Sequence, residues 1–180
     1  MRPLTNGAHG YGLVTRSLHW AMFLAVAAQF VVGFAMDAGE SGRGRGRGRG
    51  EGSGRGRGRG GGYDAFGDDR LLTVHVVLGL VILGLAIARL GWRLATPLPP
   101  WADGLSHGER TLAHWTERAL YVLMFAIPLT GLWVILQDDD DAVTPHILTH
   151  IAFFVVIAFH VGLILKHQLI DRDRLLRRML

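Results

Sequence analysis

The sequence contains no cysteine. This absence excludes disulfide bonds, thiolate-bound metals, iron–sulfur clusters and haem attached through thioether links. Any metal or haem in this protein must therefore be held by histidine, methionine or carboxylate side chains. The nine histidines among its 180 residues are the principal candidates.

Acidic and basic residues are missing from four long apolar stretches, which are Trp20–Met36, Leu71–Ile87, Leu120–Leu136 and Ile147–Leu165. A bilayer core about 30 Å thick needs about 20 mostly apolar residues in a helix. The stretches satisfy this length once their flanks are included, which gives spans over roughly residues 16–36, 70–94, 112–136 and 146–170. Residues 1–180 are therefore predicted to form a single all-α membrane domain, a four-helix bundle that runs up-down-up-down.

The distribution of basic residues predicts the orientation of the bundle. Eleven Lys and Arg residues lie on the side of the two termini, whereas Arg70 and the seven arginines of segment 41–62 lie on the other side. That Arg/Gly-rich, low-complexity segment cannot bury apolar surface, so we interpret it as a disordered loop insertion and exclude it from the count. The positive-inside rule then predicts cytoplasmic termini. With the loop on the opposite side, no nucleic-acid partner is expected, and contact with anionic lipid headgroups is the alternative role for its arginines.

Four histidines lie at matching depths in pairs. His19 and His75 are near the starts of the first and second spans, and His146 and His160 are fourteen residues apart in the fourth. Fourteen helical residues return to within about 40° of the same face and rise about 21 Å. Because successive spans run in opposite directions, His19 matches His160 in depth, and His75 matches His146. His150 competes with His146, but it lies about 80° from the face of His160.

Two imidazoles that face each other inside a helix bundle suit the axial positions of a haem iron. Zinc fits less well, because it prefers four ligands. Gly33 and Gly79 lie near the histidine faces, where a missing side chain gives a flat macrocycle room; close helix packing is the alternative. Arg89 and Arg93, one turn apart at the inner end of the second span, suit haem propionates, and positive-inside anchoring is the alternative.

Several stretches in their order resemble the bacterial cytochrome b561 family: "RSLHW", "HVVLGL", "RLGWRLATPLPP", "LYVLMFAIPLTGL", and the His146/His160 pair followed by "DRDRLLRRM". The resemblance covers nearly the whole chain except the Arg/Gly-rich insertion. It implies a multi-pass protein of the bacterial inner membrane that binds two haem b groups and exchanges electrons with ubiquinone. It also implies the four axial ligands, which fall on His19, His75, His146 and His160. The long loop departs from the family pattern, as does Glu117, which stands where relatives often have a histidine.

The predicted function is therefore electron transfer by a di-haem b protein between the quinone pool and an electron donor on the outer side. The same resemblance leaves open an activity as a superoxide:quinone oxidoreductase. No catalytic residue is predicted. An alternative is the cytochrome b anchor subunit of a periplasmic hydrogenase or formate dehydrogenase. An alternative from another class is a haem-free proton relay or transporter whose histidines titrate near neutral pH. The donor, the direction of electron flow and the formation of a homodimer stay open.

Overall fold

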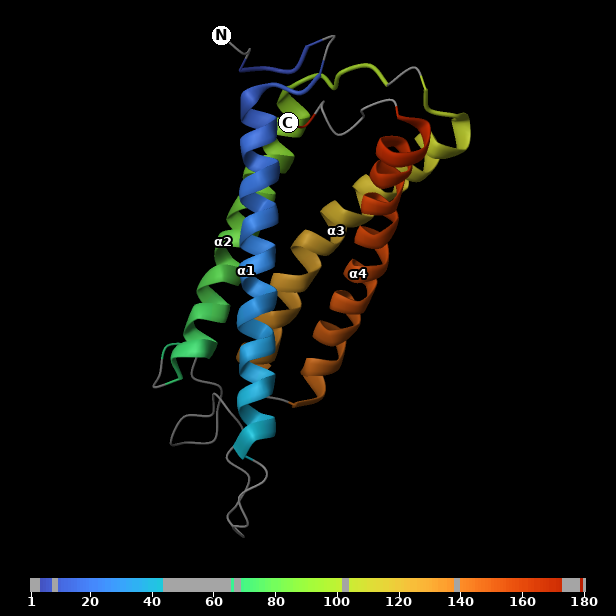
Figure 1. The fold of residues 1–180 in the computed structure, drawn as a ribbon. Coiled ribbons are helices and arrows are strands. Elements are labelled where there is room, and N and C mark those ends of the chain that lie inside the picture. Colours follow the sequence, from blue (N-terminus) through green and yellow to red (C-terminus); the bar gives the residue numbers. More distant parts are fainter. Residues whose placement is uncertain are drawn as a thin grey trace.

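Four long helices make up most of the computed structural model (Figure 1). The structure describes residues 4–7, 10–43, 66, 69–101, 104–137, 140–172 and 179, with side chains at all of these positions except 37–43 and 140. Consecutive helices run in opposite directions (Figure 1), which confirms the predicted all-α, up-down-up-down bundle. The helices are α1 (Leu13–Arg43), α2 (Arg70–Ala95), α3 (His107–Gln137) and α4 (Val143–Lys166), with a 3-10 turn (Asp140–Ala142) before α4 and a π-helical turn (His167–Asp171) after it.

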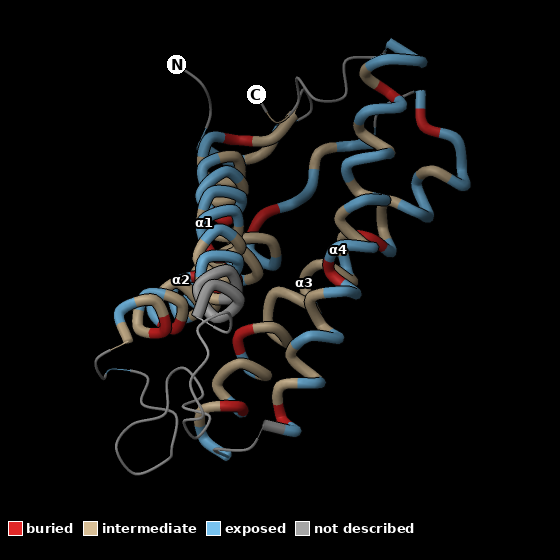
Figure 2. The backbone as a smooth tube through the Cα atoms, turned by 60° about the horizontal axis from the view of Figure 1, so that its bottom comes forward, coloured by how far each residue is buried: buried red, intermediate tan, exposed pale blue. Residues whose placement is uncertain are grey.

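Each of the four helices is long and apolar enough to cross a membrane. Only 6% to 22% of the most apolar window of each span is buried inside the protein. Figure 2 accordingly shows exposed and half-buried surface along the helices, and Leu136 is 80% exposed. Exposure of this apolar surface to water would cost about 25 cal/mol per Å², and contact with lipid removes this cost. Of the Arg/Gly-rich segment, the backbone of residues 41–43 continues α1, and residues 44–62 lie outside the described residues.

Polar side chains define where two of the spans begin. Asp69 caps α2, because its carboxylate accepts hydrogen bonds from the backbone N–H groups of Leu71 at 3.0 Å and Leu72 at 3.3 Å. Ser106 and Glu109 form a reciprocal capping box at the start of α3. The Glu109 carboxylate accepts from the Ser106 N–H at 2.8 Å, and the Ser106 hydroxyl accepts from the Glu109 N–H at 3.4 Å. These caps satisfy N–H groups that have no partner within the helix.

The bundle consists of two closely packed helix pairs. Helix α1 packs along α2 and α3 packs along α4, while α2 also contacts α3 (Figure 2). Met22, Ile82 and Ala86 form a small buried core between α1 and α2, against which side chains of α3 pack. Helix α1 meets α4 through Phe30, whose ring lies 4.6 Å from the ring of Phe154. All four helices therefore enclose a common interior.

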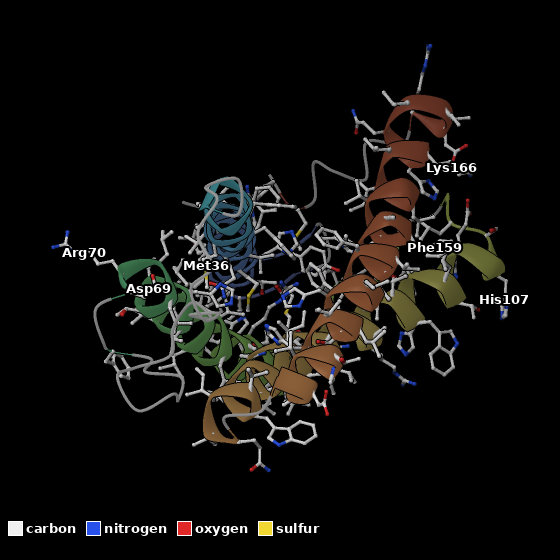
Figure 3. All side chains as sticks on the ribbon, turned by 90° about the horizontal axis from the view of Figure 1, so that it is seen from below. Met36, Asp69, Arg70, His107, Phe159 and Lys166 are labelled. Atoms are coloured by element: carbon white, nitrogen blue, oxygen red, sulfur yellow. The ribbon has the colours of Figure 1, made fainter. Side chains whose placement is uncertain are left out.

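Both chain ends lie at the same end of the bundle. Arg16 Nε and Trp20 Nε1 donate hydrogen bonds to the backbone carbonyl of Met179, at 3.3 Å and 3.0 Å. We call this end, where α2 and α4 finish, the terminal end, and we call the opposite end the loop end. Figure 3 looks at the bundle from the loop end, where Met36, Asp69 and Arg70 lie. Which end faces the cytoplasm stays a prediction.

Candidate functional site

His75 of α2 and His146 of α4 lie close together at the loop end. Their ring centroids are 6.4 Å apart, and their planes cross at 81°. Two imidazoles bound to opposite sides of one metal ion place their centroids about 6 Å apart, given about 2.0 Å for each metal–nitrogen bond and about 1.1 Å from nitrogen to ring centroid. We name these two residues the loop-end pair. They were predicted to lie at the same depth, and in the structure they also lie close together. Their role as haem ligands stays a prediction.

A cavity of about 200 Å³ lies beside the loop-end pair. All four helices contribute to its wall, which is apolar except for the two imidazoles and the amide of Gln29. An apolar wall with a few polar groups is typical of cofactor sites, although their volumes are usually about 300–1,000 Å³. Side chains around this cavity therefore have to move before a macrocycle can enter it. Met36, which lines the cavity, is labelled in the view from the loop end (Figure 3).

Glycines stand directly against both rings of the loop-end pair. A β-carbon added to Gly33 of α1 would lie 3.9 Å from Cε1 of His75. One added to Gly131 of α3 would lie only 3.0 Å from Cε1 of His146, closer than most real contacts of a β-carbon. Sequence reasoning predicted Gly33 for this role and missed Gly131. Gly131 lies on α3, which contributes no histidine to either pair, so no histidine spacing on its own helix points to it.

Gly79, the other glycine predicted from the sequence, lines the same cavity but faces a different residue. The nearest atom to a β-carbon at Gly79 would be Nε2 of Gln29, at 3.9 Å. Gln29 is 8% exposed, and its Nε2 donates a hydrogen bond to the backbone carbonyl of His75 at 3.1 Å. Gln29 was not among the residues predicted from the sequence, although a lone glutamine within an apolar stretch was a visible signal.

The two rings of the loop-end pair differ in their hydrogen bonds. Nδ1 of His75 is buried and has no hydrogen-bond partner within the described part of the chain. Nδ1 of His146 instead lies 3.0 Å from the hydroxyl oxygen of Thr130 on α3. A buried ring nitrogen without a partner costs about 1–3 kcal/mol, and coordination of a metal ion is one way to offset that cost. The His75 ring therefore fits a metal ligand.

His150, the alternative ligand at this level, lies beside the loop-end pair. Its ring centroid is 4.4 Å from that of His146, and its Nδ1 donates a hydrogen bond to the His146 carbonyl at 2.7 Å. The His150 ring packs edge-on against Phe30 of α1 at 5.7 Å. It interacts electrostatically with His75, but His146 supplies the ring that packs against the His75 ring. His146 therefore remains the preferred ligand.

His19 of α1 and His160 of α4 form the second group, here named the terminal-end pair. The two side chains are close enough to interact electrostatically, and Arg89 of α2 interacts with both. Nδ1 of His19 is buried without a hydrogen-bond partner among the described residues. His160 lies fourteen residues after His146 on α4, which places the two pairs about 21 Å apart along the helix axis.

The two arginines predicted to bind propionates have different surroundings. Arg93 Nε forms an ion pair with the carboxylate of Glu117 at 3.0 Å. The guanidinium of Arg89 lies 5.7 Å from the ring centroid of Tyr121, and it interacts with both rings of the terminal-end pair. Arg89 is thus the arginine placed beside the imidazoles, whereas Arg93 already has an anionic partner. The propionate role of both stays a prediction.

A cluster of charged groups at the terminal end was not expected from the sequence. Nζ of Lys166 lies 2.5 Å from the carboxylate of Glu109 and 2.7 Å from that of Asp171. The fully buried ring of His167 contacts the same two carboxylates, at 3.5 Å and 3.2 Å. The cluster joins the start of α3 to the end of α4. Because the Lys166 ammonium already lies between the carboxylates, we interpret the cluster as a structural connection.

The four histidines fit two haem groups better than they fit other metal centres. Each level offers two imidazoles from different helices, and the third ring at the loop end, that of His150, lies on the same helix as His146. Structural zinc requires four ligands. Buried ring nitrogens without partners and glycines that face the rings add to this fit. Bound in this way, each iron would have both axial positions filled by protein, which favours electron transfer over oxygen binding.

Comparison with known proteins agrees with this geometry. Residues 10–180 match the family model for prokaryotic cytochrome b561. The chain is 32% identical to cytochrome b562 of Cereibacter sphaeroides over 107 residues, which cover 59% of this chain and 66% of that protein. It is 23% identical to cytochrome b561 homolog 2 of Escherichia coli over 198 aligned positions, which cover 98% of this chain and 94% of the relative. The family match spans nearly the full sequence and all four helices, so the chain belongs to the prokaryotic cytochrome b561 family.

Proposed function

We propose that this protein binds two haem b groups, one at the loop-end pair and one at the terminal-end pair, and exchanges electrons with the quinone pool of the bacterial inner membrane. Membership of the family makes the chain a membrane cytochrome that transfers electrons. The observation that carries the di-haem proposal is the 6.4 Å between the ring centroids of His75 and His146 beside an apolar cavity. Their separation agrees with two axial ligands of one iron.

The protein residues hold each haem rigidly and exclude other ligands. When bound, haem b supplies reversible one-electron chemistry at its iron. The two imidazoles at each level would hold the iron from both sides, and the apolar wall around His75 and His146 would keep water away from it. Helix α4 contributes one histidine to each pair, so a single rigid element fixes the separation of the two sites.

The separation of the pairs supports electron transfer across the bilayer. The rise of about 21 Å between His146 and His160 covers much of a hydrocarbon core about 30 Å thick. An electron received near one surface can therefore leave near the other. A lipid-soluble quinone is the partner that we propose at one of these surfaces, since it reaches the bundle through the membrane. The other partner is an electron donor on the loop-end side.

Optical spectra of the purified protein and of four single His→Ala variants test the proposal. The parent is expected to show the sharp bands of reduced low-spin haem b and two haems per chain in a pyridine haemochrome assay. His75→Ala and His146→Ala are expected to lose the same haem, and His19→Ala and His160→Ala the other. A parent without low-spin haem would contradict the di-haem proposal and favour the proton-relay alternative.

Addition of a reduced short-chain quinol to the oxidised protein tests the quinone partner separately. Haem reduction that saturates with quinol concentration is the expected result. Two haems that a quinol leaves oxidised, while dithionite reduces both, would contradict the quinone partner and leave the haem assignment intact.

A further inference from the structure

We propose that Thr130 of α3 is a positioning residue for His146, and that its hydroxyl fixes the imidazole in the tautomer that leaves Nε2 for the iron. The inference deepens the proposed function and rests on it, because the role of Thr130 depends on haem ligation by His146. Sequence reasoning did not include Thr130, and helix α3 contributes no histidine to either pair.

The hydrogen bonds around Thr130 determine which atom is the donor. The hydroxyl has one proton, and it points toward the backbone carbonyls of Ala126 at 2.8 Å and Ile127 at 2.9 Å. With this proton used within α3, the hydroxyl oxygen is left as an acceptor. Nδ1 of His146 lies 3.0 Å from that oxygen, so Nδ1 carries the ring proton and donates it. In neutral imidazole the other nitrogen, Nε2, then holds a free lone pair.

Neighbouring groups support this assignment. The hydroxyl of Thr149 lies 3.4 Å from that of Thr130, but its own proton goes to the His146 carbonyl at 2.7 Å. It therefore does not supply a proton to the Thr130 oxygen. The Thr130 hydroxyl oxygen is thus left to accept from the imidazole.

Thr130 and the next residue, Gly131, act on the ring together. A β-carbon at Gly131 would lie 3.0 Å from Cε1 of His146, so the ring occupies the space that the glycine leaves. The threonine hydroxyl holds Nδ1, and the neighbouring glycine leaves room for the ring. Groups that orient a metal-binding histidine in this way also raise its basicity. His75, the other ring of the loop-end pair, has no such partner for its buried Nδ1 among the described residues.

Three substitutions in the holoprotein test this role. Thr130→Val keeps the shape of the side chain and removes the acceptor, whereas Thr130→Ser keeps the hydroxyl. Thr116→Val is the matched control, because the Thr116 hydroxyl makes the same kind of bonds to two carbonyls of α3, those of Leu112 and Ala113, both at 3.0 Å. The measurements are the midpoint potential of each haem, its low-spin electron paramagnetic resonance signal, and the rate of haem transfer to apomyoglobin. The haem that His146→Ala loses identifies the loop-end site.

Thr130→Val is expected to raise the midpoint potential of the loop-end haem only, because a less basic imidazole stabilises the oxidised iron less. The same variant is expected to move the resonance signal of that haem and to speed its loss about tenfold, the lower limit for groups that orient a ligand. Thr130→Ser should restore all three values. If Thr130→Val fails to accumulate as folded protein, Thr130→Ala removes the same hydroxyl without adding a methyl group.

Two results would overturn the role of Thr130. One is a loop-end haem with unchanged potential and unchanged signal in both hydroxyl-free variants. The other is a Thr130→Ser protein that behaves like Thr130→Val, because the hydroxyl would then not be the active group. A parent protein without two low-spin haems is a different failure, which would overturn the proposed function itself.

Discussion

A β-carbon on Gly131 of α3 would stand 3.0 Å from Cε1 of His146 on α4. The imidazole and the α3 backbone are thus in direct contact, and this contact fixes the position of one ring of the loop-end pair. Helix α3 contributes no histidine to either pair. It nevertheless positions a ring for the proposed ligation of a haem between its neighbours α2 and α4.

Gly131→Ala is therefore expected to displace the His146 ring and to weaken haem binding at the loop end. Overpacking of a close contact typically costs about 1–3 kcal/mol, so a lower thermal midpoint should accompany the loss. The measurement is the haem content per chain and the unfolding midpoint in detergent. Gly84→Ala on α2 is the matched control, because a β-carbon there meets no atom within 4 Å. Equal haem loss in both variants would count against the contact as the cause.

Removal of His150 is expected to leave both haems in place. Its Nδ1 donates to the His146 carbonyl, and its ring packs against Phe30, so it supports the position of α4 rather than the iron. Haem stoichiometry of His150→Ala beside that of His146→Ala checks this expectation. Loss of one haem in His150→Ala, with two retained in His146→Ala, would show that His150 is the ligand.

Arg89 and Arg93 are expected to affect the terminal-end haem unequally. A cation beside a haem favours the reduced iron, so Arg89→Gln should lower the midpoint potential of that haem. The shift should be roughly 40–85 mV for a loss of about 1–2 kcal/mol of charge interaction, at about 59 mV per 1.4 kcal/mol for one electron. Arg93→Gln should shift it less, because Arg89, and not Arg93, interacts with both rings of the terminal-end pair. Redox titration of both variants tests the order, and an equal or larger shift in Arg93→Gln would contradict it.

Much of the fold was predictable because a bilayer imposes strong constraints on sequence. The four uncharged apolar stretches predicted four spans, and the structure begins α3 at His107, earlier than the predicted position near residue 112. The difference arises because the Ser106–Glu109 capping box starts the helix before its apolar part. The proximity of the histidines within each pair was also predictable, since it depends only on helical rise and alternating direction.

Contacts that depend on the rotation of a helix about its own axis were not predictable. Thr130, Gly131 and Gln29 face the loop-end pair because of how α1 and α3 turn within the bundle, and apolar patterning does not fix that turn when lipid surrounds the helices. The ion pair of Arg93 with Glu117 joins different helices for the same reason. Such contacts require three-dimensional placement.

Glu109 is expected to stabilise the terminal end in two separable ways. Its carboxylate completes the capping box with Ser106 and also forms an ion pair with Lys166. Glu109→Gln keeps a side chain that can complete the box but loses the charge, whereas Glu109→Ala loses both. Thermal unfolding midpoints should therefore fall in the order parent, Glu109→Gln, Glu109→Ala. Equal midpoints for the two variants would show that the cap contributes nothing.

The orientation in the membrane is expected to place the terminal end in the cytoplasm, because basic residues stay on the cytoplasmic side during insertion. In the sequence, eleven Lys and Arg residues fall on the side of the two termini, and the opposite side reaches eight only when the seven of the Arg/Gly-rich segment are added to Arg70. A fusion of alkaline phosphatase at Gly54 should be active, since this enzyme folds only outside the cytoplasm. A fluorescent protein fused after Leu180 should be bright. The reverse pair of results would show that the arginines of the segment control insertion, and it would move the loop-end pair to the cytoplasmic side.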